Sequence, residues 1–227
     1  MVIYFMESLW IDINNGTPQF SCSSCDSCTS LMGTSLCNIK NRGCCYYYPK
    51  FTLLDIQRMS KSLKGLNTLE TIKNNPQTIM KEFQINTKGY FDEVGYEKHL
   101  KNKNFIGENI IKDQSIFFKA CPFVIPNLGC TIDAEFRTLV CNFFICTEII
   151  DSAEDKTLVD LYLKERSSYA KWCDWENEGL KHLLLGQNID LINNYNETIK
   201  YLQSISLSSY EFPKFPELKF NIKNLSV

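Results

Sequence analysis

Cysteine is the residue type whose number and spacing in this chain predict chemistry. The chain contains 11 cysteines, and all but Cys173 fall in two groups. The first group comprises Cys22, Cys25, Cys28, Cys37, Cys44 and Cys45, and the second comprises Cys121, Cys130, Cys141 and Cys146. Thiolates brought together from two parts of a chain suit zinc or an iron–sulfur cluster. The sequence therefore predicts a metal-binding protein.

The spacing within the first group favours metal ligation. Its first three cysteines follow a Cys-x-x-Cys-x-x-Cys pattern, at which neighbouring side chains can bind one metal from a tight turn. Cys44 and Cys45 are adjacent, and in extended backbone their side chains would point to opposite faces. Both can bind one centre if the backbone turns there, which Gly43 permits. Otherwise the two thiols serve two metals, or one of them packs in the core.

The sequence predicts a compartment in which cysteine thiols stay reduced. Residues 1–13 lack the basic region and the cleavage site of a signal peptide, and no apolar stretch is long enough to span a membrane. We therefore expect a cytoplasmic protein without membrane contact, in which structural disulfides are disfavoured. A secreted protein in which disulfides use these cysteines is the alternative.

Composition and net charge indicate the size of the domain and the kinds of partner that the protein can bind. A chain of 227 residues with 44% hydrophobic residues can form one small domain with its own core. The net charge of -2 gives no excess of Lys and Arg for phosphate backbones, so we expect no nucleic-acid partner.

Helical signals dominate the pattern outside the cysteines, so the predicted fold is mainly α, with irregular cysteine-rich metal-binding loops and room for one short hairpin. Thr52 and Asp55 form a capping signature at the start of an apolar helical face that runs to Gly65. A second signature, at 152–155, opens a helix that reaches Trp175. The remaining expectations are an irregular loop over 20–48, a helical stretch over 69–83, a hairpin within 89–107, a strand or extended arm over 115–120, and helices over 180–185 and 189–202.

These elements predict a division at residue 150. Residues 1–150 would form the cysteine-cluster metal-binding domain, and residues 151–227 would form a helical extension packed on it.

The cysteines and their neighbours resemble the YkgJ-type cysteine-cluster family, described as zinc- or iron-chelating proteins. The resemblance covers about residues 20–60 and 115–147. It is carried by Phe20-Ser-Cys22-Ser-Ser-Cys25, Gly43-Cys44-Cys45, Phe51-Thr-Leu-Leu-Asp55-Ile-Gln-Arg58, Cys121-Pro-Phe-Val, Cys130-Thr-Ile and Arg137-Thr-Leu-Val-Cys141. The chain departs from the family pattern in an insertion that holds Cys28 and Cys37, and in Thr138 and Asn142, which replace a proline and a second arginine.

The resemblance implies a set of ligands and a choice of centres. The first-choice ligands are Cys22, Cys25, Cys44, Cys45, Cys121, Cys130 and Cys141, followed by Cys28 and Cys37. This is more than one tetrahedral site can use, so two zinc sites, one iron–sulfur cluster, or a cluster beside a zinc ion are open. Cys146 and Cys173 are expected to be buried core residues.

Several residues near the cysteines have two interpretations each. Arg137 could donate hydrogen bonds to thiolates, or form a salt bridge with Asp133 or Glu135. The aromatic residues at 46–48 and 143–144 could shield a metal, although core packing is favoured. His99 and His182 are the chain's two histidines, and we expect neither to be a ligand.

The signatures of nucleotide-binding proteins, zinc proteases and serine hydrolases are missing, so any enzymatic activity would depend on the metal centre. The flagellin lysine methylases carry a similar cysteine cluster, which makes a cluster-dependent protein-modifying enzyme one alternative. The other is a structural zinc module that binds a protein partner.

Overall fold

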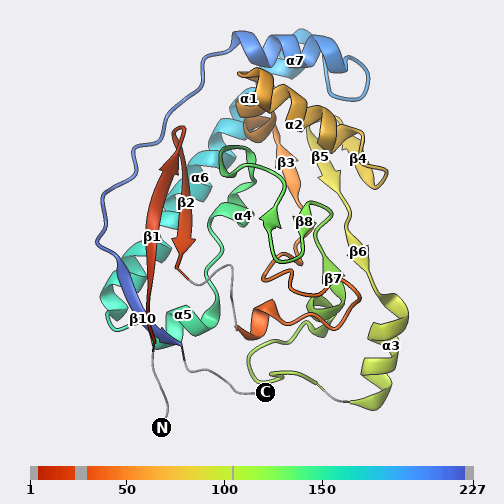
Figure 1. Cartoon of the computed structure of the whole chain (residues 1–227). Coiled ribbons are helices and arrows are strands. Elements are labelled where there is room, and N and C mark those ends of the chain that lie inside the picture. The colour runs from red at the N-terminus through yellow and green to blue at the C-terminus, as the bar shows by residue number, and fades with distance from the viewer. Residues whose placement is uncertain (1–4, 24–29, 104, 223–227) are drawn as a thin grey trace.

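The computed structural model describes residues 5–23, 30–103 and 105–222 (Figure 1). Its fold is mixed α/β, so the prediction of a mainly α protein with irregular loops was wrong. Four small antiparallel sheets accompany the helices in the described ranges. The strands were missed because most are short and because the Asn15-Gly16 turn between the first two was not recognised.

The first sheet joins the two ends of the described chain. Strands β1 (Phe5–Asn14), β2 (Thr17–Cys22) and β10 (Leu218–Ile222) are ordered β10-β1-β2 (Figure 1). Asn15 and Gly16, with φ of 47° and 76°, turn the chain from β1 into β2. An Asn-Gly pair is a strong hairpin signal, because both turn residues need positive φ. The predicted helical extension therefore ends in a strand, while the division at residue 150 stays a prediction.

The other sheets are smaller. Strands β3 (Lys50–Thr52), β4 (Thr78–Lys81) and β5 (Gln84–Thr87) form a sheet in the order β3-β5-β4. Strand β6 (Tyr90–Phe91) pairs with β7 (Lys119–Ala120), and β8 (Val124–Ile125) pairs with β9 (Gly129–Cys130). The hairpin expected within 89–107 is not formed, since the hairpins of the described chain are β1–β2, β4–β5 and β8–β9.

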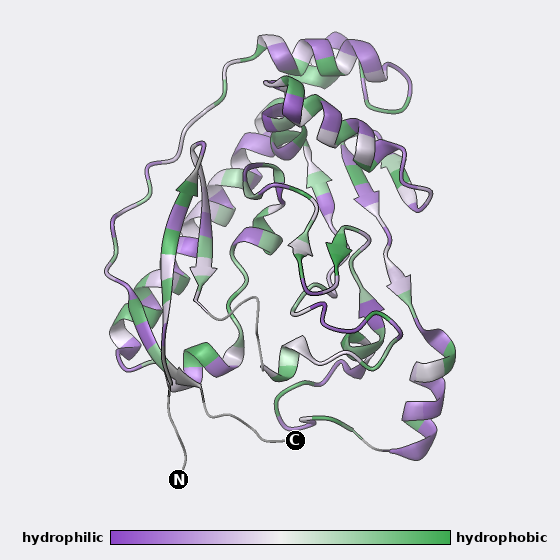
Figure 2. Cartoon of the chain, viewed as in Figure 1, coloured by the Kyte–Doolittle hydropathy of each residue, from purple (hydrophilic) through white to green (hydrophobic). Residues whose placement is uncertain are grey.

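The helices surround these sheets. They are α1 (Leu53–Ser60), α2 (Leu63–Lys73), α3 (Glu93–Asn102), α4 (Leu139–Asn142), α5 (Thr147–Ser152), α6 (Lys156–Gln187) and α7 (Tyr195–Ser204). Short 3₁₀ turns lie at Leu31–Gly33, Gln114–Phe118 and Ala134–Phe136. Apolar and polar residues alternate around α2, as expected of a helix with one buried face (Figure 2).

The predicted capping box at the start of α1 is confirmed. The Thr52 hydroxyl accepts from the Asp55 N–H, and the Asp55 carboxylate accepts from the Thr52 N–H at 2.9 Å. The helix expected to run on to Gly65 is two helices, because Ser62 caps α2 by accepting from the Gly65 N–H at 3.0 Å.

Other boundaries differ from the predictions. The helical stretch expected over 69–83 ends with α2 at Lys73, and the chain continues through Pro76 into β4. The segment 115–120 is a 3₁₀ turn followed by β7. Residues 180–185 belong to α6, which is capped by Asp155. Part of the loop expected over 20–48 is β2 and a 3₁₀ turn.

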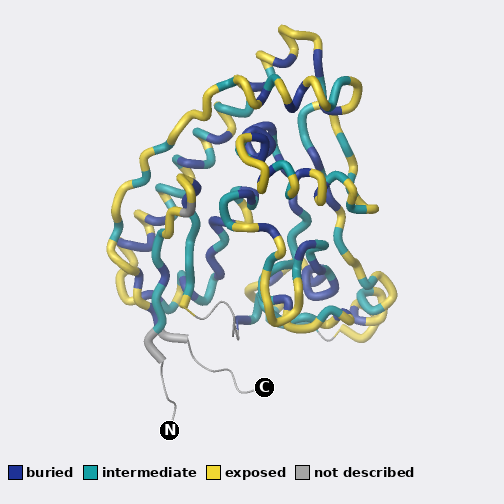
Figure 3. The backbone as a smooth tube through the Cα atoms, turned by 45° about the horizontal axis from the view of Figure 1, so that its top comes forward, coloured by how far each residue is buried: buried dark blue, intermediate teal, exposed yellow. Residues whose placement is uncertain are grey.

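Helix α1 lies at the centre of the largest core, packed against α2, α6 and α7. Its side chains are largely buried, whereas residues 206–217 run along the outside of the molecule from α7 to β10 (Figure 3). None of the described helices is long and apolar enough to cross a membrane.

Candidate metal centre

A turn places Cys44 and Cys45 next to each other. Gly43 has φ of +56°, and the Tyr46 N–H donates to the Cys44 carbonyl at 2.9 Å. The turn that Gly43 permits is therefore present. The two thiols are hydrogen-bonded to each other, so the pair points to one region rather than to opposite faces.

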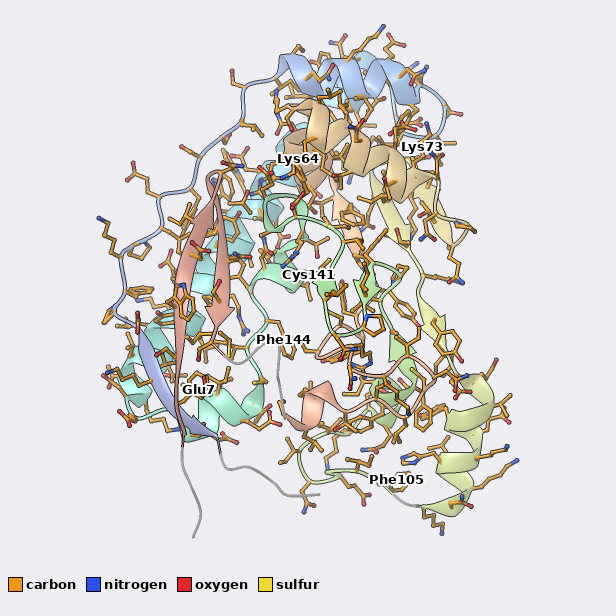
Figure 4. The ribbon with its side chains drawn as sticks, viewed as in Figure 1. Glu7, Lys64, Lys73, Phe105, Cys141 and Phe144 are labelled. Carbon is orange, nitrogen blue, oxygen red and sulfur yellow. The ribbon has the colours of Figure 1, made fainter. Side chains whose placement is uncertain are left out.

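The second cysteine group meets this turn. The Cys121 N–H donates to the Cys45 carbonyl at 2.8 Å, which fixes the two chain segments side by side. Cys130 lies in β9 of the short β8–β9 hairpin, and Cys141 lies in α4 and is exposed (Figure 4). The Thr138 hydroxyl donates to the Cys141 sulfur at 3.3 Å.

Electrostatic coupling defines a set of four thiols, Cys45, Cys121, Cys130 and Cys141. The charge of Cys45 acts on each of the other three. Hydrogen bonding from Cys44, assisted by two arginines, lowers the pKa of Cys45 to about 7. Burial raises the pKa of Cys121 to about 12. We call this set the four-thiol cluster.

Arg137 belongs to the cluster. Its Nε donates to the Ile132 carbonyl at 2.7 Å, and its guanidinium hydrogen-bonds to the Cys130 thiol. The alternative salt bridge is not formed, because Asp133 and Glu135 pair with Lys64 at 3.1 Å and 3.0 Å. Of the two interpretations from sequence, the structure favours the hydrogen bond to sulfur.

Arg42 is a cluster neighbour that the sequence reasoning missed. Its side chain is buried, with 2% of the residue exposed, and its Nη2 donates to the carbonyls of Thr34 and Ile116 at 3.0 Å and 2.8 Å. Its Nε has no hydrogen-bond partner in the described structure. The signal in the sequence was an arginine directly before Gly43-Cys44-Cys45.

The surroundings of Arg42 contain thiols rather than carboxylates. Burial lowers the pKa of Arg42, and the charges of Cys37, Cys45 and Cys44 oppose that shift. In the part of the chain that the structure describes, no ion pair joins Arg42 or Arg137 to a carboxylate. Two guanidinium groups therefore flank the thiols.

The remaining predicted ligands are scattered. Cys22 ends β2 and packs against the core of β1, β10 and α6. Cys37 is fully buried, and its sulfur lies 3.7 Å from the Ile39 carbonyl. Cys25 and Cys28 lie outside the described residues. Cys146 and Cys173 are buried, in agreement with the core positions expected for them.

The chemical nature of the cluster side chains suits a metal, but their placement does not yet form a metal site. The cluster offers four sulfurs and two cations, which suits a thiolate-bound metal. Within residues 5–23, 30–103 and 105–222, however, no three His, Cys, Asp or Glu side chains are placed so that they could hold a metal ion.

His99 and Phe143 are core residues, whereas Tyr47 and Tyr48 lie near the cluster, since the charges of Cys141 and Cys121 act on their phenols. His99 is buried and its ring nitrogen lies 3.3 Å from the Gln114 amide oxygen. Phe143 packs in the main core against Phe20, with ring centroids 4.8 Å apart. Tyr46 packs against Phe144 and under the Arg42 guanidinium.

Comparison with known proteins gives no relative. No family model, no curated protein and no solved structure matches this chain. The resemblance to the YkgJ-type family stays a prediction that rests on the motifs quoted above.

Proposed function

We propose that this chain binds zinc or an iron–sulfur cluster through the four-thiol cluster, Cys45, Cys121, Cys130 and Cys141. The observation that carries the proposal is the pair of guanidinium groups beside these thiols, one of them buried, with no carboxylate paired to either among the described residues. A buried cation without a counter-charge is costly, typically by several kcal/mol.

A thiolate-bound metal supplies the missing charge. Four thiolates around a divalent ion leave a net negative charge, and an iron–sulfur cluster bound by four thiolates is also an anion. Arg42 and Arg137 would balance that charge and donate hydrogen bonds toward sulfur, as groups around metal sites commonly do. Neutral thiols alone would leave both guanidinium groups uncompensated.

The sulfurs must converge further to bind one metal. Metal binding commonly orders its own ligands, since a finished site rarely exists before the metal enters. Three of the four thiols come from loops or very short elements, namely the turn at 43–46, the residue after β7 and the β8–β9 hairpin. Such segments can shift at lower cost than a helix within the core.

The other predicted ligands are assigned to exchange with a cluster thiol or to a second metal centre. Cys44 is adjacent to the cluster and could replace a member, and Cys22, Cys25, Cys28 and Cys37 could serve a second centre. Membership of the YkgJ-type family and a cytoplasmic location, where thiols stay reduced, are part of the same proposal.

Metal analysis of variants tests the proposal. Protein purified without oxygen should contain stoichiometric zinc, or iron with acid-labile sulfide and a brown colour. Cys45→Ser, Cys121→Ser and Cys130→Ser should each lose most of the metal. Cys173→Ser is the matched control, because Cys173 is buried on α6 in contact with Tyr169 and should not affect loading. Metal loss equal in the control and the cluster variants would contradict the proposal.

A further inference from the structure

A cavity of about 210 Å³ lies beside the candidate metal centre, between α1, α4 and α6. Its lining includes Tyr47, Leu54, Thr138, Val140 and Asn177. The neighbour of Val140 in α4 is Cys141, and the charge of Cys141 acts on the Tyr47 phenol. The cavity is therefore adjacent to the four-thiol cluster without being part of it.

A wider hollow lies next to this cavity. It has a volume of about 680 Å³ and lies between the β4–β5 hairpin and α6. Thr52, Gln84, Asp174 and Asn177 line both spaces, so the two lie side by side and share a wall.

Two unpaired charges of opposite sign line the smaller cavity. Lys50 and Asp174 are both exposed, and the side chain of neither takes part in an ion pair or hydrogen bond of the described structure. The third charged group in the lining, Asp55, is already compensated, since it caps α1 through Thr52 and pairs with Arg58 at 3.9 Å.

The charges of the wider hollow are mixed and partly compensated. Glu178 and Lys181 pair with each other at 3.6 Å, and Lys81 and Glu82 are exposed neighbours of opposite sign. Asp174 stands at the junction of the two spaces. The hollow therefore gives no strong preference for an anion or a cation.

The walls of the smaller cavity combine aliphatic and neutral polar groups. Leu54, Leu139, Val140 and Ala170 supply the aliphatic surface. Hydroxyl and amide groups from Tyr47, Thr52, Thr138, Gln84 and Asn177 add polar surface, although those of Thr52, Thr138 and Asn177 also bond to Asp55, Cys141 and Leu54. Binding sites for small polar ligands commonly show this composition, with a few polar groups placed on an apolar lining.

We propose that the smaller cavity binds a free α-amino acid with an aliphatic or thioether side chain. Lys50 would bind the α-carboxylate, Asp174 would bind the α-ammonium group, and the aliphatic walls would cover the side chain. The volume of about 210 Å³ equals about seven water molecules at their share of liquid volume, which suits an amino acid of the size of leucine or methionine.

This inference does not depend on the metal. Lys50 and Asp174 lie on β3 and α6, and neither belongs to the four-thiol cluster. Binding can be measured on the full-length chain with and without metal, so failure of amino acid binding and failure of metal binding are separate results.

Calorimetric titration of the full-length protein with L-leucine and L-methionine tests the proposal. We expect saturable binding of the zwitterions, and at least tenfold weaker binding of leucinamide, which lacks the carboxylate, and of 4-methylpentanoate, which lacks the amine. No saturable heat with any amino acid, or equal binding of the analogues that carry one charge, would overturn the proposal.

Two pairs of variants complete the test. Lys50→Gln and Asp174→Asn should each weaken binding of L-leucine at least tenfold, and both should fold because the two side chains are exposed and unpaired in the described structure. Asp160→Asn and Lys164→Gln are matched controls, since these exposed residues of α6 line neither space. If the controls weaken binding as much as the cavity variants do, the effect is one of net charge and the assigned site is wrong.

Discussion

Cys121 donates its backbone N–H to the carbonyl of Cys45 at 2.8 Å, and this hydrogen bond joins the two cysteine groups of the chain. The contact brings the turn at Gly43 against the start of the segment that carries Cys130 and Cys141. The backbones of Cys45 and Cys121 therefore lie side by side, and the charges of Arg137 and Arg42 act on the Cys45 thiol.

Replacement of Arg42 should weaken metal retention. Arg42→Gln removes a buried positive charge beside the thiols, so we expect at least about a tenfold loss of metal affinity in a chelator competition, equal to about 1.4 kcal/mol. Arg42→Lys should restore part of the affinity through its charge, although it cannot reproduce the guanidinium hydrogen bonds.

The control for this prediction is Lys40→Gln, which removes an exposed positive charge close to Arg42 in the sequence. Arg42 also bonds to the carbonyls of Thr34 and Ile116, so the unfolding of each metal-free variant should be measured alongside. Unchanged chelator competition in a folded Arg42→Gln protein would exclude Arg42 as a counter-charge of the metal.

The capping box should stabilise α1 measurably. Thr52→Ala removes the side-chain cap, and we expect the free energy of unfolding to fall by about 1 kcal/mol. Thr71→Ala is the control, because the Thr71 hydroxyl is exposed and bonds within α2 to the Asn67 carbonyl. Urea unfolding followed by circular dichroism should separate the two variants, and equal stability would mean that the cap contributes nothing.

Gly65 should tolerate no side chain. A Cβ built on Gly65 would lie 2.1 Å from the Met59 carbonyl oxygen, so α1 and α2 would have to separate. Gly65→Ala should therefore destabilise the fold by about 2 kcal/mol. Gly179→Ala, on α6 with no neighbouring atom in the described structure within 4 Å, should stabilise it by about 0.8 kcal/mol. The same sign for both variants in thermal unfolding would contradict this assignment.

Stability should fall at alkaline pH because of Tyr162. Its phenol is fully buried, donates to the Pro216 carbonyl at 2.8 Å, and has a pKa raised by burial to about 12. Because this pKa is higher in the folded protein than in the unfolded chain, Tyr162 contributes its full stabilisation below pH 10, the pKa of an unfolded tyrosine. That stabilisation is lost as the pH rises from about 10 toward 12.

By pH 11 this loss should reach about 1.4 kcal/mol in the wild-type protein. Tyr162→Phe should be somewhat less stable at pH 8 and should show a smaller loss between pH 8 and pH 11. Denaturant unfolding at several pH values measures both slopes, and identical slopes would show that Tyr162 is not the group responsible.

The features predicted well were local. The start of α1 follows from Thr52 and Asp55, and the turn at Cys44 follows from Gly43, because capping and positive φ depend on a few neighbouring residues. The split between α1 and α2 was also visible in principle, since Ser62 is a capping residue three positions before Gly65.

The features predicted poorly depend on distant partners. Strand β10 exists because Leu218–Ile222 pairs with β1 at the opposite end of the chain, and nothing within the segment signals that pairing. The role of Arg42 likewise could not be predicted from its neighbours in the sequence alone, because it depends on the distant Ile116 carbonyl and on the thiols around its guanidinium. By contrast, the Asn15-Gly16 turn was a local signal that predicts the β1–β2 hairpin and was not used.

X-ray absorption spectroscopy of the protein purified without oxygen tests the central claim most directly. The proposed centre predicts a metal surrounded by sulfur at about 2.3 Å, with four such neighbours for zinc. The Cys45→Ser and Cys130→Ser proteins should show fewer sulfur neighbours or no metal. A metal shell of nitrogen and oxygen, or a folded protein without metal under these conditions, would contradict the proposal.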